Sequence, residues 1–464
     1  MADSKAAAAS PARQSAYYLL GAALQGTGAL LVQPFSIRIL DPTEWGRVGL
    51  SAVLLQVGQV VLSAGLPLAI TRAYFTPKVG RLHARAIHGA NTALSLGISI
   101  AAASAYYLLS PDRESAATFA WAIAATGLLS VVVGAQAILR SQRRALSFMI
   151  LSGGASLGAH LFGLLAIAFI GADSVTYLIA FTIGMLVTAG AAFALASPLW
   201  PGKAWPAVKG AFRLGLPVVP HSMAIMLLMQ GDSFLLQHFQ NSGAVGRYVA
   251  AAAFALGPFA VLSALNNVWT ARIFEASQGE RLAENIRAVG NQAAIMGGAI
   301  AIGGSAAATL GMLVLKGDDH EVMQLAKVLP GVACGYALYL VAMSVMFARQ
   351  KTGAFTWVTP LVLIATIGVA VLPAQSDHYW LLGTVKAASF AGLGVAYYII
   401  AARMLPASIP LRTYAVAALG SAVCIGGNFL LPTTAPVGAA TISVAAIAAV
   451  GCFLAARRRG LASW

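Results

Sequence analysis

Asp232 is the only acidic residue that falls inside a long hydrophobic run of this sequence. The run covers residues 213–239, which is long enough to cross a bilayer and also contains Pro217, Pro220 and His221. An ionised carboxylate is costly in hydrocarbon, so an intramembrane acid usually faces a cavity or a charged partner. Asp232 is therefore a candidate for binding a coupling ion, either a proton or Na⁺.

Lys386, in the apolar run 378–402, lies at a depth similar to that of Asp232. The two residues could form a buried ion pair, which is the simpler interpretation. In the alternative, Asp232 binds a coupling ion and Lys386 contacts an anionic substrate. His160 and His221 also lie in hydrophobic runs and could titrate near neutral pH. A lone intramembrane histidine usually makes a satisfied polar contact, so we expect neither to be essential.

Arg47 and Arg247 are related by an offset of 200 residues and lie on the outer side of the membrane in the topology derived below. This placement runs against the usual location of basic residues. Arg47 has Asp41 and Glu44 nearby to neutralise it, whereas Arg247 has no acidic neighbour in sequence. We therefore predict that Arg247 faces a cavity and binds substrate, with Arg47 as a weaker candidate.

Arg72 and Arg272 are related by the same offset and end two hydrophobic runs on the cytoplasmic side. They could simply extend their charged heads to the membrane surface. Alternatively, they could capture a phosphate at the inner mouth, because a guanidinium can donate two hydrogen bonds to phosphate at once. Arg38 is a further candidate, although it could pair with Asp41 across i to i+3.

The elements that position these residues are membrane-spanning helices. The chain has 464 residues, of which 59% are apolar and 9% charged, against roughly 25% charged residues in soluble domains. Long apolar runs joined by short basic loops are typical of a multi-pass helical membrane protein. We expect fourteen spans, near 14–40, 46–70, 86–109, 116–139, 148–171, 174–197, 213–239, 244–271, 288–315, 322–348, 354–373, 378–402, 411–431 and 435–456.

Most of the 29 Lys and Arg residues fall in loops on one side of these spans. This asymmetry predicts that both termini are cytoplasmic, including a short tail over residues 1–13 that lacks the apolar core of a signal peptide. The net charge of +15 is thus explained by membrane topology, and no nucleic acid partner is expected.

The sequence also repeats with an offset of 200 residues. Gly46-Arg47 matches Gly246-Arg247, and Val61-Leu62-Ser63-Ala64 matches Val261-Leu262-Ser263-Ala264. Six spans separate the copies, so both halves enter the membrane in the same direction, related by a pseudo-twofold axis along the membrane normal. We predict an all-α fold with two parallel six-helix lobes, 14–202 and 203–405, and two additional helices in 406–464.

Prolines and glycines concentrate in the spans that begin each repeat. Pro34, Pro67, Pro217, Pro220 and Pro258 lie in or beside spans 1, 2, 7 and 8. A proline inside a helix removes a backbone hydrogen bond and permits a kink. Gly and Pro are common in membrane helices in any case, but this concentration predicts that these four spans contain the hinges of a moving gate.

The chain resembles polysaccharide flippases of the Wzx type, in the multidrug/oligosaccharidyl-lipid/polysaccharide (MOP) exporter superfamily. The similarity covers spans 1–12 in order. It is carried by Arg38-Ile39-Leu40 leading into Asp41-Pro42-Thr43-Glu44-Trp45-Gly46, by Gly65-Leu66-Pro67 with Arg72, by Arg140, Arg143 and Arg144, and by Gly215-Leu216-Pro217, Pro220-His221-Ser222, Asp232 and Val245-Gly246-Arg247-Tyr248. Family members often have Asp-Arg where this chain has Asp232-Ser233.

This resemblance implies a carrier in the bacterial inner membrane that moves an undecaprenyl pyrophosphate-linked oligosaccharide from the cytoplasmic to the periplasmic leaflet. It also implies polysaccharide polymerase and chain-length proteins as partners, in the synthesis of lipopolysaccharide O-antigen, capsule or exopolysaccharide. A dianionic pyrophosphate bearing a polar glycan cannot cross hydrocarbon unaided. Such a carrier needs a wet cavity, fixed positive charge and a lateral opening for the lipid tail.

Other functions are less well supported by the sequence. It contains no Walker lysine loop, no Ser/His/Asp or Cys/His set and no metal-ligand spacing, so we expect no catalytic residues, no metal and no cofactor beyond H⁺ or Na⁺. A cation-coupled multidrug exporter of the same superfamily is the main alternative, although it would favour several acidic cavity residues. A membrane scaffold for a glycan-export complex is the third hypothesis.

Overall fold

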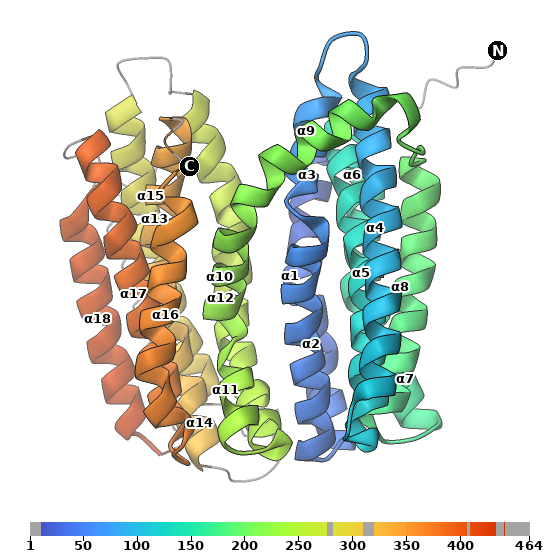
Figure 1. Ribbon diagram of the computed structural model, residues 1–464. Coiled ribbons are helices and arrows are strands. Elements are labelled where there is room, and N and C mark those ends of the chain that lie inside the picture. Colours follow the sequence, from blue (N-terminus) through green and yellow to red (C-terminus); the bar gives the residue numbers. More distant parts are fainter. Residues whose placement is uncertain are drawn as a thin grey trace. The chain divides into compact units, whose positions relative to one another are not determined.

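The structure is a computed structural model that describes residues 11–275, 282–309, 320–349, 351, 353–405, 409–432 and 440. Every regular element in these ranges is a helix, and no strand occurs in them (Figure 1). Ten of the described helices are long and apolar enough to cross a membrane. The expected all-helical multi-pass class is therefore confirmed.

Each of the first thirteen predicted spans corresponds to one helix or to a helix with a break. The predicted span at 435–456 lies outside the described residues, as does most of the tail 1–13, so the count of fourteen stays a prediction. In chain order the elements are α1 (Pro11–Ile39), α2 (Pro42–Ser63), α3 (Leu66–Tyr74), α4 (Gly80–Leu109), α5 (Arg113–Ser141), α6 (Ala145–Gly153), the π-helical turn η1 (Gly154–Gly158), α7 (Ala159–Phe169), α8 (Ser174–Ala196), the 3₁₀ turn η2 (Gly202–Ala204), α9 (Trp205–Gly215) and the 3₁₀ turn η3 (Leu216–Val218). They continue with α10 (Val219–Gln230), α11 (Asp232–Phe239), α12 (Ser242–Glu275), α13 (Leu282–Ala308), α14 (His320–Val328), the 3₁₀ turn η5 (Leu329–Gly331), α15 (Val332–Ala348), α16 (Phe355–Ala374), α17 (Tyr379–Met404) and α18 (Leu411–Leu430).

The chain divides into two compact units. Unit 1 comprises Met1–Val32 and Ser51–Val219, and unit 2 comprises Gln33–Leu50 and Pro220–Trp464. Unit 2 thus includes the tip of the α1–α2 hairpin, residues 33–50, while α9 belongs to unit 1. The predicted six-helix lobes with boundaries at 202 and 405, and the twofold relation between them, stay predictions.

In unit 1 the second predicted span is broken, because Ala64 and Gly65 adopt the left-handed conformation with φ values of 47° and 69°. At Gly65 a side chain is also sterically excluded, since its Cβ would lie 2.5 Å from the carbonyl oxygen of Gly215. The end of α9 is therefore held against the start of α3. Val208 and Ala211 bury the rest of this face of α9.

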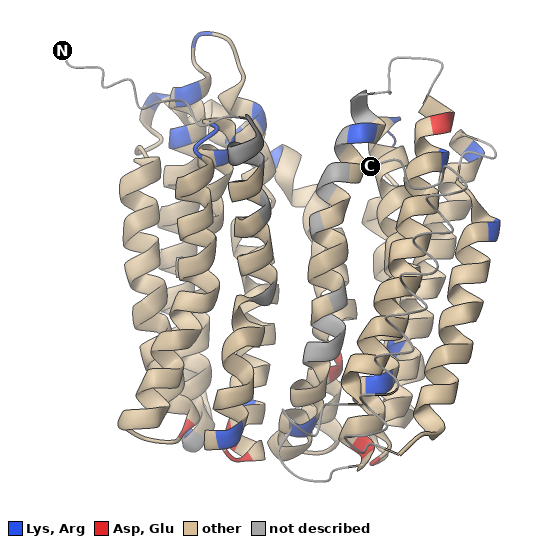
Figure 2. Ribbon diagram, turned by 180° about the vertical axis from the view of Figure 1, so that it is seen from behind, with Lys and Arg blue, Asp and Glu red and all other residues tan. Residues whose placement is uncertain are grey.

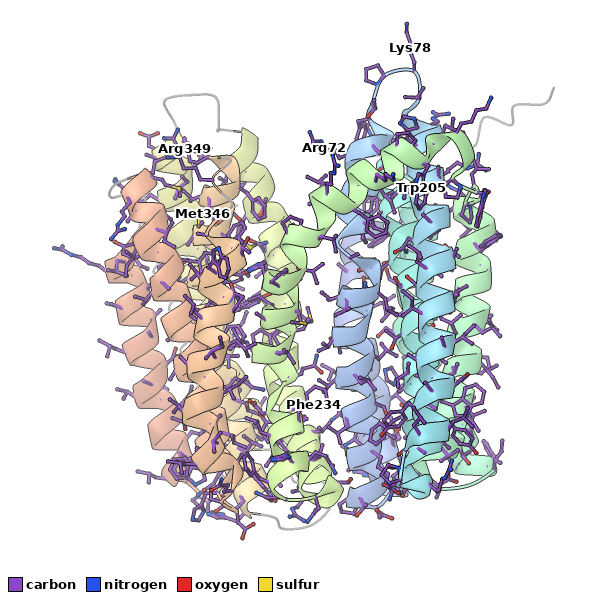
Figure 3. The ribbon with its side chains drawn as sticks, in the orientation of Figure 1. Arg72, Lys78, Trp205, Phe234, Met346 and Arg349 are labelled. Carbon is purple, nitrogen blue, oxygen red and sulfur yellow. The ribbon has the colours of Figure 1, made fainter. Side chains whose placement is uncertain are left out.

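Basic side chains gather at one end of the helices of unit 1 (Figure 2). Figure 3 shows Arg72 and Lys78 at this end, together with Trp205 at the start of α9. All three side chains are exposed. The positive-inside rule assigns such an end to the cytoplasmic side, and the orientation of the chain in the membrane stays a prediction.

The hairpin tip packs on α12 inside unit 2 through two glycines with the repeat spacing. A Cβ at Gly46 would lie 1.8 Å from the carbonyl oxygen of Ser242, and a Cβ at Gly246 would lie 1.8 Å from that of Pro42. The contact is reciprocal, with each helix presenting the same position to its counterpart 200 residues away. Only glycine allows these two backbones to approach so closely.

Unit 2 is built around α15, most of whose residues are buried. A Cβ at Gly335 of α15 would lie 2.4 Å from the amide nitrogen of Ala391 on α17. Polar contacts hold α18, since Asn428 donates to Ser305 of α13 at 2.8 Å and the buried Lys327 of α14 donates to the carbonyls of Asn428 and Leu431 at 3.0 and 2.6 Å. The ammonium thus adds a donor at the end of α18, where the carbonyl of Asn428 also accepts the backbone N–H of Leu431 at 3.1 Å.

The close contact between α15 and α17 gives a test of the fold. We expect Gly335→Ala to destabilise the protein by about 1–3 kcal/mol, because the added methyl must push two helix backbones apart. Gly392→Ala on α17 is the matched control, since nothing lies within 4 Å of a Cβ at that position. Thermal unfolding of the purified variants in one detergent compares them, and equal midpoints would contradict the packing described.

Candidate functional site

Asp232, the intramembrane acid identified in the sequence, lies at a break in the seventh predicted span. There α10 ends at Gln230, Gly231 intervenes, and α11 begins at Asp232. A break of this kind leaves carbonyls without intrahelical partners on one side and N–H groups on the other. The helix dipoles favour a cation at the end of α10 and an anion at the start of α11.

Both charges are present at this break. Lys386 of α17 donates from Nζ to the carbonyl oxygen of Met229 at 2.7 Å, and the same Nζ lies 2.7 Å from Oδ2 of Asp232. The side chains of Lys386 and Asp232 are only 2% and 8% exposed. The predicted buried pair is confirmed, and it places opposite charges in the apolar interior of unit 2 with almost no contact with solvent.

Tyr248 of α12 completes this cluster, which we call the ion-pair site. Its hydroxyl donates to Oδ2 of Asp232, the oxygen that also faces Lys386. The Lys386 ammonium lies 5.4 Å from the centre of the Tyr248 ring, a distance at which a cation and an aromatic face attract each other. The carboxylate is thus engaged by one cation and one hydroxyl, which join α11, α12 and α17.

Arg247 directs its charge toward the start of α17. Its guanidinium donates to the hydroxyl of Tyr379 at 2.7 Å and lies 5.6 Å from the centre of that ring. Tyr379 in turn donates to Gln240 at 3.4 Å, and the Gln240 amide donates to the carbonyls of Ala374 and Ser376 at 3.0 and 2.9 Å. The half-buried Arg247 is therefore linked through Tyr379 and Gln240 to the ends of α11, α16 and α17.

The repeat-related Arg47 has a different partner. It forms an ion pair with Glu44 at 2.6 Å, which confirms local neutralisation by a nearby acid. Asp41 accepts the backbone N–H groups of Thr43 and Glu44 at 2.8 and 3.0 Å and so caps the first turn of α2. Arg38 is exposed in the last turn of α1, and its pairing with Asp41 stays a prediction.

Each of the two inner arginines lies at the surface of its own unit. Arg72 is exposed at the end of α3 in unit 1. Arg272 is exposed in the last turn of α12 and donates to Gln292 of α13 at 3.2 Å. It follows Arg247 by 25 residues on one continuous helix, which is about 37 Å at the α-helical rise. Within unit 2, Arg247 and Arg272 thus fall at opposite ends of one helix.

Three of the five predicted hinge prolines, Pro67, Pro217 and Pro220, lie at or next to irregular points of the backbone. Pro34 is inside α1, and Pro67 is in the first turn of α3 after the left-handed break. Pro217 lies in η3, and Pro220 follows at the start of α10, where the chain passes from unit 1 to unit 2. Pro258 lies within α12, which continues through it. Their role as gate hinges stays a prediction.

The two histidines considered from the sequence make satisfied contacts, as expected. His160 hydrogen-bonds the hydroxyl of Tyr177 at 2.7 Å. Both ring nitrogens of His221 have partners, since Nδ1 lies 2.9 Å from the hydroxyl of Thr359 and Nε2 lies 3.2 Å from that of Tyr339. These contacts account for both histidines within the packing of their units.

Sequence reasoning missed the tyrosines that complete the site. Tyr248 directly follows Arg247, and Tyr379 precedes Lys386 by seven residues, or two helical turns. A tyrosine at one of these positions is ordinary in an apolar helix. The signal that could have identified them is the combined spacing, because it places a phenol and a cation on each of two spans.

A sequence model of the family described as "Polysaccharide biosynthesis protein" matches residues 12–275. The chain belongs to this family. The match covers more than half of the chain, from α1 to the end of α12. No curated protein matches the sequence.

Several solved structures of other proteins share the fold of this chain. A MOP superfamily transporter from Pyrococcus furiosus superposes with a TM-score of 0.58 and 16% identity, over 86% of this chain and 95% of that chain. An inward-facing multidrug resistance MATE family transporter gives 0.59 and 16%, over 87% and 95%. A Vibrio cholerae MATE transporter gives 0.54 and 14%, over 86% and 97%. At such identities the similarity establishes the fold alone.

Family and fold together confirm the resemblance to Wzx-type flippases of the MOP superfamily. The protein is a member of this polysaccharide biosynthesis family, and its multi-helical fold is that of the solved MOP superfamily transporters.

The ion-pair site makes a specific energetic prediction. Replacing Asp232 alone with Asn should destabilise the protein by about 3–5 kcal/mol, because Lys386 then remains buried without its counter-charge. The double variant Asp232→Asn/Lys386→Met should cost clearly less than the sum of the single variants. Denaturant or thermal unfolding in detergent measures this coupling.

The control for this double-mutant cycle of Asp232 and Lys386 is Glu284→Gln. It changes an exposed acid of α13 and should alter the free energy of unfolding by less than about 0.5 kcal/mol. Additive effects of the Asp232 and Lys386 substitutions would show that the two side chains do not interact in the membrane.

Proposed function

We propose that this transporter moves an isoprenoid pyrophosphate-linked oligosaccharide from the cytoplasmic to the periplasmic leaflet by alternating access. The polysaccharide biosynthesis family supports a glycan substrate. The MOP fold supports a carrier that opens to each side in turn. A bacterial inner membrane location with both termini in the cytoplasm follows from this proposal and from the distribution of basic residues.

The observation that carries the proposal is that Asp232, the one acid within a predicted span, already has a cation and a hydroxyl as partners. Oδ2 of Asp232 faces Lys386 and accepts the hydroxyl of Tyr248. A carboxylate neutralised in this way does not offer the negative charge that a cationic drug needs. Arg247 instead carries a guanidinium with several N–H donors, one of which is given to the hydroxyl of Tyr379, and donors suit a pyrophosphate. We therefore assign substrate binding first to Arg247 and then to Arg47 and Arg38 of the hairpin tip.

The remaining candidate residues receive roles consistent with their positions. Arg72 and Arg272, at the opposite ends of the spans, would meet the pyrophosphate when the carrier is open to the cytoplasm. Lys386 is already paired, so an anionic substrate reaches it only by displacing Asp232. A proton on Asp232 would weaken the pair and release Lys386, and this exchange is the coupling step that we propose. Na⁺ is the alternative coupling ion.

The hairpin tip is the proposed outer gate. Residues 33–50 pack on α12 at the glycine crossing of Gly46 and Gly246. Release of this contact would open the periplasmic side, with bending at Pro34 in α1 and at Pro217 and Pro220 between α9 and α10. Polysaccharide polymerase and chain-length proteins remain proposed partners of the assembled pathway.

The substrate proposal is tested on the pool of lipid-linked glycan in the native cell. We expect depletion of the protein to cause complete, inward-facing repeat units to accumulate severalfold. Arg247→Ala should produce the same accumulation, whereas Arg247→Lys should produce less, because it keeps the charge but not the fork of donors. Protein levels in the membrane are compared for each variant.

The competing functions give different results in this experiment. An unchanged pool with new sensitivity to cationic dyes would favour a multidrug exporter, the activity printed for one of the structural relatives. Accumulation on depletion without any effect of Asp232→Asn or Arg247→Ala would favour a scaffold for a glycan-export complex.

The gate is tested with a disulfide across the glycine crossing. A Cβ at Gly243 would lie 3.5 Å from Oγ1 of Thr43, so Thr43→Cys with Gly243→Cys should crosslink under oxidation. We expect oxidation to stop transport and a reductant to restore it. Thr43→Cys alone is the control, and full transport by the crosslinked protein would refute the outer gate.

A further inference from the structure

A second polar cluster lies inside unit 1, on α4. His88 is 0% exposed, and neither of its ring nitrogens has a hydrogen-bond partner among the described residues. Oδ1 of Asn91 and Oγ1 of Thr92 are also buried without a partner in this part of the chain. These three residues lie at i, i+3 and i+4 of α4 and so share one face of that helix.

The cluster faces a position of α5 that has no side chain. A Cβ at Gly134 would lie 2.6 Å from Nδ1 of His88 and 3.1 Å from Nδ2 of Asn91. Asn91 donates from this nitrogen to the carbonyl of Ser130, one turn away on α5, at 3.1 Å. His88 and Asn91 therefore converge on Gly134, and their orientation is fixed from both helices.

Polar groups in such a position require a partner. A buried donor or acceptor without a hydrogen bond costs free energy, and native structures satisfy nearly all of them. One nitrogen of a neutral imidazole donates and the other accepts. The carboxamide oxygen accepts, and the hydroxyl does both. A water molecule complements this set, because it donates and accepts and typically makes about three hydrogen bonds in protein interiors.

His221, another intramembrane histidine, shows how protein groups can occupy both nitrogens of an imidazole. Both ring nitrogens of His221 are occupied by hydroxyl groups of Thr359 and Tyr339, and its ring stacks on Phe355 at 5.1 Å. His88 has no comparable set of protein partners among the described residues. It also lies eight residues into α4, about 12 Å from the start of the helix, which is the basic end of unit 1.

We propose that His88, Asn91 and Thr92 form a hydrated proton-binding site at the α4–α5 interface. Water held by Asn91 and Thr92 contacts the imidazole of His88 and allows it to exchange a proton with the solution. The site does not depend on the identity of the transported substrate. It gives unit 1 a charge that changes with pH, separate from the ion pair of unit 2.

The groups that can accept the proton at this site are neutral, because the described charged side chains around it are exposed or hydrogen-bonded elsewhere. The main elements packed against α4 are α3, α5, α9 and η2. On α4 itself, Arg81 is exposed, and Arg85 donates to the carbonyl of Ser197 at 2.6 Å. The described charged side chains of the packed elements are all exposed, and they are Arg72, Arg113, Arg140, Lys203, Lys209 and Arg213. The titratable Tyr74 of α3 and His83 of α4 are half-buried.

The test measures hydrogen–deuterium exchange at the imidazole C2 position of each histidine, by mass spectrometry of the purified full-length protein in lipid nanodiscs. We expect the exchange rate at His88 to rise with pH along a titration curve, as it does for an imidazole that exchanges a proton with the solution. His221 should exchange far more slowly at every pH. Exchange at His88 as slow as at His221 would overturn the proposal, whatever the transport assays show.

A matched pair of variants locates the site. Gly134→Ala places a methyl against Nδ1 of His88 and should slow its exchange severalfold. Gly97→Ala, also within unit 1, is the control because nothing lies within 4 Å of a Cβ there. Equal His88 exchange in both variants would contradict a water site at the α4–α5 interface. Thermal unfolding and the exchange of the half-buried His83 confirm that each variant is folded.

Discussion

The pairing of Asp232 with Lys386 is the constraint on which the organisation of unit 2 depends. A lone carboxylate in hydrocarbon would be strongly destabilising, and the protein meets this cost with a cation, a phenol hydroxyl and a helix break. Lys386 donates a hydrogen bond to a carbonyl at the end of α10, and Asp232 lies at the start of α11. The break and the ion pair therefore support each other, and a straight seventh span would lose both contacts.

Close backbone approach is the second constraint, and glycine provides it in both units. The crossing of Gly46 with Gly246 brings the hairpin tip onto α12, and the contact of Gly65 with Gly215 holds α9 on α3. These contacts lie beside the positions where the chain passes between units. A transporter that alternates between states needs interfaces that are well packed in each, and small residues permit this without large side-chain rearrangement.

Periodicity and charge in the sequence were sufficient to predict the helical class, the approximate spans and the Asp232–Lys386 pair, because each depends on the cost of exposing polar groups to hydrocarbon. The breaks at Ala64 and Gly231 could not be located in this way. They depend on which carbonyls find a tertiary partner, and that is decided by residues such as Lys386 far along the chain. His88 was missed although Asn91, Thr92 and Ser95 follow it on one helical face, a polar stripe that distinguishes it from the isolated His160 and His221.

The most direct test of the account is reconstitution of the purified protein in liposomes with a fluorescent isoprenoid pyrophosphate-linked oligosaccharide in both leaflets. Addition of a reductant that quenches only the outer leaflet reports whether the inner pool becomes accessible. The account predicts that wild-type protein makes the inner pool accessible and that excess soluble pyrophosphate-bearing analogue slows this exchange. Movement of a cationic dye with no movement of the lipid-linked glycan would contradict it.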